Sequence, residues 1–142
     1  MNIRIAQPQD FPAICSLMKN ELGYPELNET EAVKRLEFFR KSEDFETFVA
    51  DTNGFIAGFI GVMKSVAYNY DGYYSQIMVL AVSENARRKG IGTALVKKTE
   101  EWTLSFGIKG IGVNSGLHRL NTHTFYEING YIKKSYSFTK EL

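Results

Sequence analysis

The sequence predicts an α/β (α+β) fold, in which a mixed, mostly antiparallel sheet of six to seven strands is flanked by about four helices. Two observations support this prediction. Short runs in which apolar and polar residues alternate, typical of strands, are interspersed with longer runs whose apolar residues recur every three or four positions, typical of helices. The runs follow the order strand, two helices, three strands, then helix, strand, helix, strand, which combines an antiparallel meander with a right-handed crossover.

The N-terminal part of the chain reads as a strand followed by two helices. Residues 3–5 alternate between apolar and polar, as a short strand does. Asp10 then caps a helix whose apolar residues keep helical spacing as far as Leu22. Residues 29–41 form a second helix that is apolar on one side and charged elsewhere, which predicts a surface position.

The middle of the chain reads as three consecutive strands. Residues 47–50 and 55–66 flank Asn53-Gly54, a dipeptide that readily adopts the positive φ values of a tight hairpin. Residues 75–82 follow, and they are apolar on both faces from their third residue onward, which predicts a central position in the sheet. We therefore expect these strands to form an antiparallel meander.

The C-terminal part alternates between helix and strand. Residues 90–106 carry an apolar stripe, and Gly107 stands where a left-handed residue commonly ends a helix. Residues 108–114 alternate as a strand, residues 120–128 form a helix, and residues 131–139 read as a last strand. If exposed, this last strand offers an edge through which two copies could pair as a homodimer.

Composition limits the classes of function. The 142 residues fit a single domain, residues 1–142, that can bury its own core. Because 17 Lys and Arg residues balance 16 Asp and Glu residues, no basic field favours nucleic acid as a partner.

No apolar run approaches the ~18 residues of a membrane span, and the N-terminus lacks a signal-peptide pattern. The single cysteine, Cys15, fits a reducing compartment as a buried, inert thiol, so we expect a cytoplasmic protein that does not contact a membrane.

The most informative segment is residues 82–93, where a buried strand leads into a helix. Three cations, residues 87–89, crowd the N-terminus of that helix, although free N–H groups and the helix dipole already make this end positive. Such a site favours an anion. Gly90 and Gly92 have no Cβ, which leaves room for a phosphate to approach the backbone N–H groups. A solvated basic turn with two loop glycines would explain the same residues without a ligand.

Arg87-x-x-Gly90-x-Gly92, directly after a strand, resembles the acyl-CoA pyrophosphate loop of the GNAT superfamily of N-acyltransferases. The start of the chain supports this resemblance. Residues 3–6, followed by Asp10 and an apolar helix, are similar to the family's opening.

The C-terminal part carries a third similar motif in the family's order. Phe125-Tyr126-x-x-x-Gly130-Tyr131 is similar to the family's late helix-to-strand motif, so the match covers essentially all 142 residues. Within the superfamily, three segments resemble the aminoalkylphosphonate N-acetyltransferase type: residues 115–119, 123–126 and 138–142.

This resemblance implies an enzyme that moves an acetyl group from acetyl-CoA, its co-substrate, to a primary amine of a small molecule by direct attack in a ternary complex. It implies that the strand ending at Val82 splays from the next strand, so that its backbone pairs with the pantetheine arm, chiefly at Val82. The turn that follows would hold the pyrophosphate. The cofactor-binding residues expected on this basis are Leu80, Ala81, Val82, Arg87, Arg88, Lys89, Gly90, Ile91, Gly92, Thr93, Asn114, Arg119 and Asn121. Arg119 replaces the family's usual Asn, so it could reach a CoA phosphate or an anionic acceptor, or simply face solvent.

The resemblance also suggests catalytic residues. Tyr126 matches the tyrosine that protonates the departing thiolate in many relatives, and His123 lies on the same helix face. A core tyrosine and a structural histidine are the alternatives for these two positions. Gln76 stands where many relatives have a glutamate, and an amide cannot take a proton. The base would then be water, an amine bound already neutral, or a side chain such as His118, His123 or Asp71.

The aromatic segment of residues 68–74 supplies the expected acceptor site, with Tyr70, Asp71 and Gln76 as substrate-binding residues. Aromatic rings beside a carboxylate suit a cationic amine. Cross-strand aromatic pairs that frame a hairpin explain the segment equally well. No metal site is expected, because His118 and His123 lack the spacing of metal ligands on one helix face.

Three other functions fit the same residues. The acceptor could be a protein or peptide amine. The chain could be a regulatory module that binds acyl-CoA without turnover, which the neutral Gln76 would suit. The turn could also bind a nucleotide phosphate unrelated to CoA, in which case ATP would protect the fold from heat better than CoA does.

Overall fold

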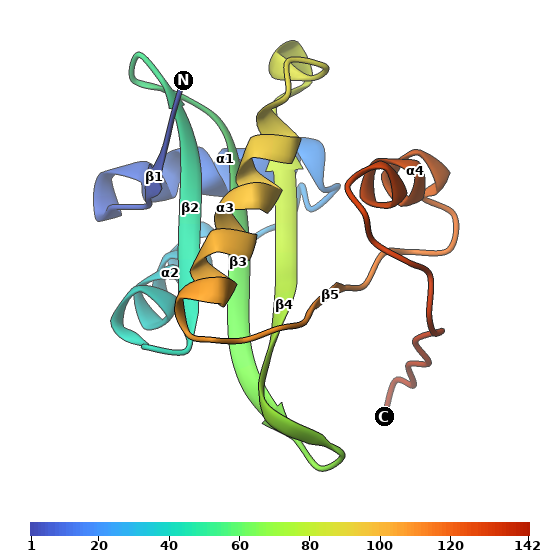
Figure 1. Cartoon of the computed structure of the whole chain (residues 1–142). Coiled ribbons are helices and arrows are strands. Elements are labelled where there is room, and N and C mark those ends of the chain that lie inside the picture. The colour runs from blue at the N-terminus through green and yellow to red at the C-terminus, as the bar shows by residue number, and fades with distance from the viewer.

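The computed structural model describes all 142 residues as a five-stranded sheet with helices on both faces (Figure 1). The strands lie in the order β1-β2-β3-β4-β5, with antiparallel neighbours except for the parallel pair of β4 and β5. Helices α1 and α2 cover one face, α3 covers the other, and α4 stands beside the sheet next to β4 (Figure 1). In chain order the elements are β1 (Asn2–Ile5), the 3-10 turn η1 (Pro8–Asp10), α1 (Phe11–Glu21), α2 (Glu29–Lys41), β2 (Phe45–Thr52), β3 (Phe55–Ala67), β4 (Tyr70–Val82), the 3-10 turn η2 (Glu84–Ala86), α3 (Ile91–Ser105), β5 (Ile111–Val113) and α4 (Leu120–Ile128).

Each face of the sheet carries its own apolar core. Strand residues alternate between the faces, so Val49 packs towards α1 and α2, whereas its neighbour Phe48 packs towards α3. Cys15 belongs to the first core at 1% exposure, and burial raises the pKa of its thiol, as expected of an inert cysteine. None of the helices is both long and apolar enough to cross a membrane.

The α/β class and most of the predicted elements are confirmed. The helices predicted at residues 29–41 and 120–128 have those bounds in the structure. Asn53 and Gly54 adopt φ values of 52° and 89°, as the hairpin between β2 and β3 requires. The predicted strand 75–82 lies within β4, which is next to the edge of the sheet while β3 is central; β4 begins at Tyr70 and pairs with β3 to form a longer hairpin than expected.

The predicted sheet of six to seven strands is wrong, because the structure has five. Only Ile111–Val113 of the strand predicted at 108–114 pairs with β4. Residues 131–139 join no strand, and no residue beyond Tyr131 takes part in a backbone hydrogen bond. A period-2 pattern becomes a strand only where an edge is available, and β5 offers an edge of just three residues. The pairing of this segment with a second copy stays a prediction.

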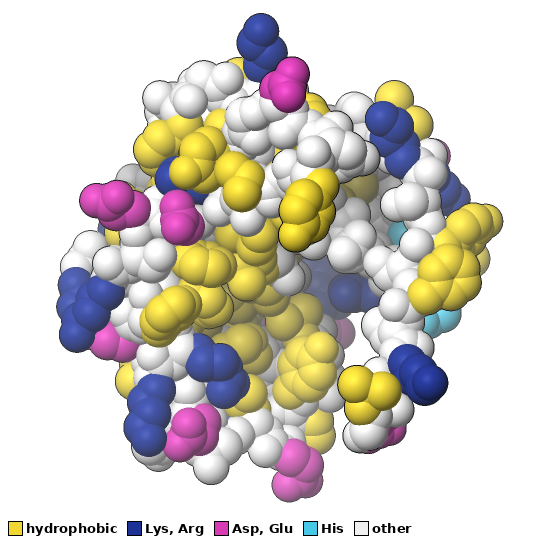
Figure 2. All heavy atoms as spheres, turned by 90° about the horizontal axis from the view of Figure 1, so that it is seen from below, with side chains coloured by type: hydrophobic (Ala, Val, Ile, Leu, Met, Phe, Trp, Pro, Cys, Tyr) yellow, Lys and Arg dark blue, Asp and Glu magenta, His cyan; other side chains and the backbone are white.

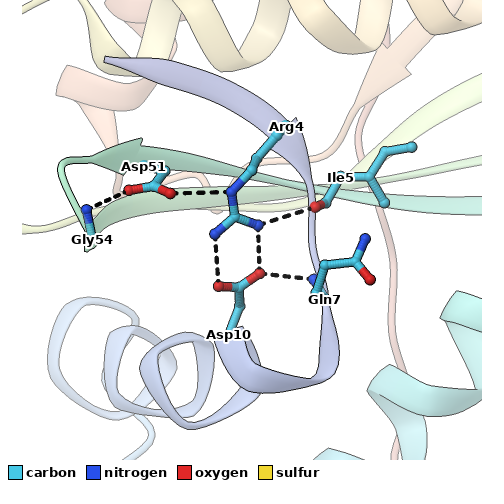
Figure 3. A network of polar contacts seen from close by, with 6 residues as sticks. All are labelled: Arg4, Ile5, Gln7, Asp10, Asp51 and Gly54. Atoms are coloured by element: carbon cyan, nitrogen blue, oxygen red, sulfur yellow. Dashed lines mark hydrogen bonds and ion pairs between the residues drawn. The ribbon is translucent and has the colours of Figure 1, made fainter.

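Arg4 on β1 joins three parts of the N-terminal half (Figure 3). Its guanidinium donates to both carboxylate oxygens of Asp10, at 2.7 and 2.9 Å, and its Nε donates to Asp51 on β2 at 3.1 Å. Asp10 is the N-cap residue of α1, as predicted, but its side chain makes no cap hydrogen bond, because its carboxylate accepts from Arg4 and from the Gln7 N–H at 2.7 Å instead. A bidentate pair with a guanidinium is stronger than a single cap bond, and it anchors β1 to the start of α1.

Candidate functional site

The turn that leads into α3 has an unusual backbone. Arg88 has a φ of 64° and Gly90 a φ of 79°, so both are left-handed. This conformation costs a residue with a Cβ about 1–2 kcal/mol, and such strain is concentrated at functional sites. Left-handed residues next to right-handed ones aim successive N–H groups at one point, as in the nests that bind anions.

The N–H groups of this turn have no acceptor within the chain. Those of residues 88–93 donate to no carbonyl, and no side chain caps the helix. The groups on either side are satisfied, because Arg87 donates to the Glu84 carbonyl and Ala94 to the Gly90 carbonyl. A run of free donors at the N-terminus of a helix favours a phosphate, whose oxygens accept several hydrogen bonds at once.

One of the three predicted cations is already paired. The Arg87 guanidinium donates to the Glu21 carboxylate at 2.6 Å, and the other oxygen of Glu21 accepts from the Glu84 N–H at 3.2 Å. Arg88 and Lys89 are exposed and make no ion pair. The end of α1 is therefore attached to the turn, and two cations rather than three are free to meet an anion.

Only one of the two glycines opens space beside the turn. A Cβ built on Gly90 would meet no atom within 4 Å. A Cβ on Gly92 would lie 3.2 Å from the Phe125 ring, because α4 packs against the first turn of α3 there. The Phe125 ring therefore fills the space on the Cβ side of Gly92, whereas its N–H stays free, and its role in phosphate binding stays a prediction. Ile91 is buried beneath the turn, and Thr93 is half-buried.

The edge of β4 next to the turn is also unpaired. β5 pairs with β4 at three positions, ending with Val113 opposite Ile77, and from there to Val82 β4 is paired with β3 alone. The pairing of β4 with β3 shifts at the same place, so that Met78 is the extra residue of a bulge. The two strands thus splay just where the bulge lies, as the resemblance implied.

The free backbone groups on this edge can be identified from the alternation of the strand. The Ser83 N–H donates to the Ala57 carbonyl of β3 at 2.8 Å. Neighbouring residues of a strand point their N–H and C=O groups to opposite sides, so Ala81 also faces β3. Leu80 and Val82 therefore direct their backbone groups away from β3, towards the gap, whereas those of Ala81 are unavailable to a ligand there.

Tyr126 lies in the core with its hydroxyl unpaired. Its side chain is 7% exposed, and its ring packs edge-on against Phe125 and Tyr131. The hydroxyl bonds to no group of the chain and is not among the fully enclosed atoms. Burial raises the pKa of Tyr126 to about 12, and the positive charge of Arg119 opposes this rise. The side chain therefore remains a phenol at neutral pH, able to donate.

His123 has a structural contact. Its Nε2 lies 2.8 Å from the Gly116 carbonyl, which can only accept, so Nε2 donates this hydrogen bond. Nδ1 is buried and has no partner. The ring thus fixes the loop ahead of α4, and its other nitrogen, Nδ1, is shielded from solvent. A role for His123 as the base stays a prediction.

The other predicted cofactor residues flank α4. Asn114, Arg119 and Asn121 are exposed and lie between the end of β5 and the first turn of α4. Of these, Arg119 is close enough to act on the pKa of Tyr126. No group of three or more His, Cys, Asp or Glu side chains is placed to hold a metal ion.

The structure does not bring all of the predicted acceptor residues to this site. Tyr70 and Asp71 are exposed at the tip of the β3–β4 hairpin, which extends from the sheet at the end opposite the turn (Figure 1). They lie roughly 40 Å along β4 from Val82. Gln76, by contrast, lies in β4 two residues before the bulge, opposite Met63 and Gly112.

A pocket of about 180 Å³ opens on the α1 and α2 face of the sheet. Hydrophobic side chains from both helices and from β2, β3 and β4 line it, and they include Met78 and Val79. Seen along the sheet from the hairpin end, hydrophobic side chains gather across the middle of the molecule, and a hollow separates them from the C-terminal part (Figure 2). A shallower depression of about 480 Å³ lies between η1 and α2, and no residue of β4 lines it.

Three residues that shape the site were not predicted. Glu21 pairs with Arg87 across 66 positions of sequence, which no local pattern signals. Met78 continues an apolar run, so the bulge is invisible in the sequence. Arg35 lines the pocket from α2. Its position next to Leu36, at the margin of the apolar stripe, was the one signal available.

The chain is similar to known proteins in both sequence and fold. The family model described as Acetyltransferase (GNAT) family matches residues 11–131. The chain is 26% identical over 132 residues to the aminoalkylphosphonate N-acetyltransferase of Salmonella typhimurium, which covers 93% of this chain and 82% of that protein. The crystal structure of a transcriptional regulator from Bacillus halodurans C-125 has a TM-score of 0.92 at 22% identity, covering 99% of both chains. The aminoglycoside N-acetyltransferase AAC(6')-Iy, in complex with CoA, has a TM-score of 0.88 at 13% identity, covering 99% of this chain and 93% of the other.

Proposed function

Because the chain belongs to the acetyltransferase (GNAT) family of N-acetyltransferases, we propose that it transfers the acetyl group of acetyl-CoA to the primary amine of a small molecule, by direct attack in a ternary complex. The observation that carries this proposal is the run of free N–H groups from residue 88 to residue 93, next to the unpaired edge of β4. The first feature suits a diphosphate, and the second suits an arm that contains amides.

Acetyl-CoA binds across these two features. The free N–H groups of the turn hold the pyrophosphate, and the exposed side chains of Arg88 and Lys89 add positive charge. The backbone groups of Leu80 and Val82 pair with the amides of the pantetheine arm, as a further strand would. The structure of AAC(6')-Iy with CoA, which shares the fold, supports a CoA thioester as the co-substrate.

The amine attacks the thioester carbon, and charge develops on the carbonyl oxygen. A backbone N–H on the free edge of β4 donates to that oxygen and stabilises the charge. The C–S bond then breaks and the thiolate leaves. No covalent intermediate with the protein is needed, because the amine and the thioester meet in one complex.

Tyr126 stabilises the departing sulfur as a hydrogen-bond donor. Its pKa of about 12 exceeds that of a thiol, which is ~8.5. Complete transfer of its proton to the thiolate is therefore uphill by about 5 kcal/mol in the free protein. A hydrogen bond from the phenol does not carry that cost, and the positive charge of Arg119 already holds the pKa below the value that burial alone would give.

The proton of the attacking amine has no carboxylate base beside the bulge. Gln76 is neutral. Glu46, the one acidic residue along the pocket that reaches Met78 and Val79, alternates with Thr47 and shares the α3 face of the sheet with Phe48. The amine therefore enters in its neutral form or loses its proton to water.

The test is release of CoA thiol from acetyl-CoA with a panel of small amines, peptides and aminoglycosides. Tyr126→Phe should lower kcat by ~10–100-fold and leave the Kd for acetyl-CoA within about twofold, because the hydroxyl acts only as the thiolate leaves. Tyr131→Phe is the matched control, since it removes a neighbouring hydroxyl that bonds to Glu100, and kcat should be unchanged. An unchanged kcat in Tyr126→Phe would remove this residue from the mechanism, and tight CoA binding without thiol release from any amine would favour a binding module.

A further inference from the structure

We infer that the acceptor is a small amine with an anionic group at its other end, and that Arg35 binds this group in the pocket on the α1 and α2 face. This inference rests on the proposed function and specifies the acceptor of that reaction. It adds a specificity-determining residue that lies on the opposite side of the sheet from α3.

The pocket reaches the place where the thioester would lie. Met78 and Val79 line it, and β4 loses its β5 partner directly after Ile77. An amine in the pocket therefore approaches the free edge of β4 from the face covered by α1 and α2, while the CoA arm occupies the gap that β5 leaves. The amine and the thioester therefore reach the bulge by separate routes.

The size and lining of the pocket limit the acceptor. Its 180 Å³ equals the volume of roughly six water molecules, well below the volume of a drug-sized site. Leu36, Phe39 and Phe45 make the wall apolar, which suits methylene groups. A chain of a few carbons between the amine and the other end of the molecule fits this space.

Arg35 is the one basic side chain of α2 whose charge is uncompensated. It lines the pocket and makes no ion pair. The other basic side chains of this helix pair with its own glutamates: Lys34 with Glu31, and both Arg40 and Lys41 with Glu37. A free guanidinium beside an apolar pocket binds a phosphonate, phosphate or carboxylate in a bidentate manner.

No negative side chain enters the pocket to neutralise Arg35 or to attract a polycation. Glu46 contributes to the lining, but its side chain alternates with that of Thr47 and shares a face with Phe48, beneath α3. One of its carboxylate oxygens accepts from the Thr47 N–H at 3.2 Å. The pocket therefore combines a cation with an apolar wall, which is the complement of an aminoalkyl oxyanion.

The test compares two acceptors of equal length, 3-aminopropylphosphonate and 3-aminopropanol, by thiol release with saturating acetyl-CoA. The wild-type protein should prefer the phosphonate by at least ~10-fold in kcat/KM. Arg35→Gln should lower kcat/KM for the phosphonate by ~10–100-fold, mainly through KM, and leave aminopropanol within about threefold. Arg40→Gln, which removes an arginine from the same helix outside the pocket, is the matched control and should retain the preference.

The outcomes separate this inference from the function on which it rests. An active enzyme that uses both acceptors equally, or an Arg35→Gln variant that keeps the preference, would overturn the role of Arg35 alone. The absence of thiol release with every amine would overturn the proposed function and this inference together. 4-Aminobutyrate in place of the phosphonate then distinguishes a carboxylate from a phosphonate as the preferred anion.

Discussion

Replacing Gly90 by alanine should weaken CoA binding, because the turn needs this residue in a left-handed conformation. Its φ of 79° costs a residue with a Cβ about 1–2 kcal/mol. A Cβ there would touch no atom of the chain, so no steric clash adds to this cost. If the turn relaxes in the free variant, CoA must restore the strained form, which weakens binding by ~5–30-fold.

Gly107 provides a matched control at the other end of α3. Its φ is 73°, and a Cβ there would also meet nothing within 4 Å. Gly107→Ala should therefore lower the free energy of unfolding by about 0.5–1.5 kcal/mol, since the strain is partly offset by a less flexible unfolded chain. It should leave the CoA affinity unchanged, because this glycine is remote from the turn.

The assay is isothermal titration calorimetry with CoA, combined with urea unfolding of both variants. The strain at Gly90 is divided between stability and binding, so the two losses in Gly90→Ala should sum to about 1–2 kcal/mol. The reasoning is refuted if Gly90→Ala loses neither CoA affinity nor stability relative to the wild-type protein. It is equally refuted if Gly107→Ala weakens binding to the same extent.

Two further substitutions test ion pairs of the structure, that between Arg4 and Asp10 and that between Arg87 and Glu21. The Arg4 guanidinium holds the pKa of the Asp10 carboxyl below its usual value of 3.8, so this contact stabilises the fold above that pH and is lost as the pH falls through the lower folded-state pKa. Asp10→Asn should thus lower the free energy of unfolding by about 2–3 kcal/mol at pH 7 and by much less at pH 2. Urea unfolding at the two pH values measures this difference, and an equal loss at both would contradict the prediction. Glu21→Gln removes a carboxylate that competes for Arg87 beside the phosphate site, so CoA affinity should rise ~2–5-fold by calorimetry. A weaker affinity would mean that Glu21 instead holds the turn in its binding form.

Local sequence patterns were sufficient to predict most of the helices and strands. The helix at residues 29–41 and the hairpin turn at Asn53-Gly54 rest on spacing and on the φ preferences of single residues, and both are confirmed. The strand predicted at residues 131–139 rests on the same kind of pattern and is wrong. Pairing needs a partner edge, and the sequence alone does not tell that β5 would be only three residues long.

The candidate site likewise combines features that the local sequence predicted with contacts that it could not predict. The turn of residues 87–93 was predicted because cations and glycines at the start of a helix are a local conflict that a ligand resolves. The pairing of Arg87 with Glu21 and the contact of Gly92 with Phe125 are tertiary, and no spacing reveals them. The placement of Tyr70 at the hairpin tip follows from the length of β4, which extends five residues earlier than the apolar pattern indicated.

The central claim is that the free N–H groups of residues 88–93 grip the diphosphate of CoA. Amide NMR spectra of the ¹⁵N-labelled protein, titrated with CoA and separately with pantetheine, test it directly, because pantetheine has the same arm without the phosphates. CoA should shift the amide signals of residues 88–93 together with those of Leu80 and Val82, whereas pantetheine should leave the signals of the turn in place. CoA that binds without moving the signals of the turn, or that moves no signal at millimolar concentration, would contradict the claim.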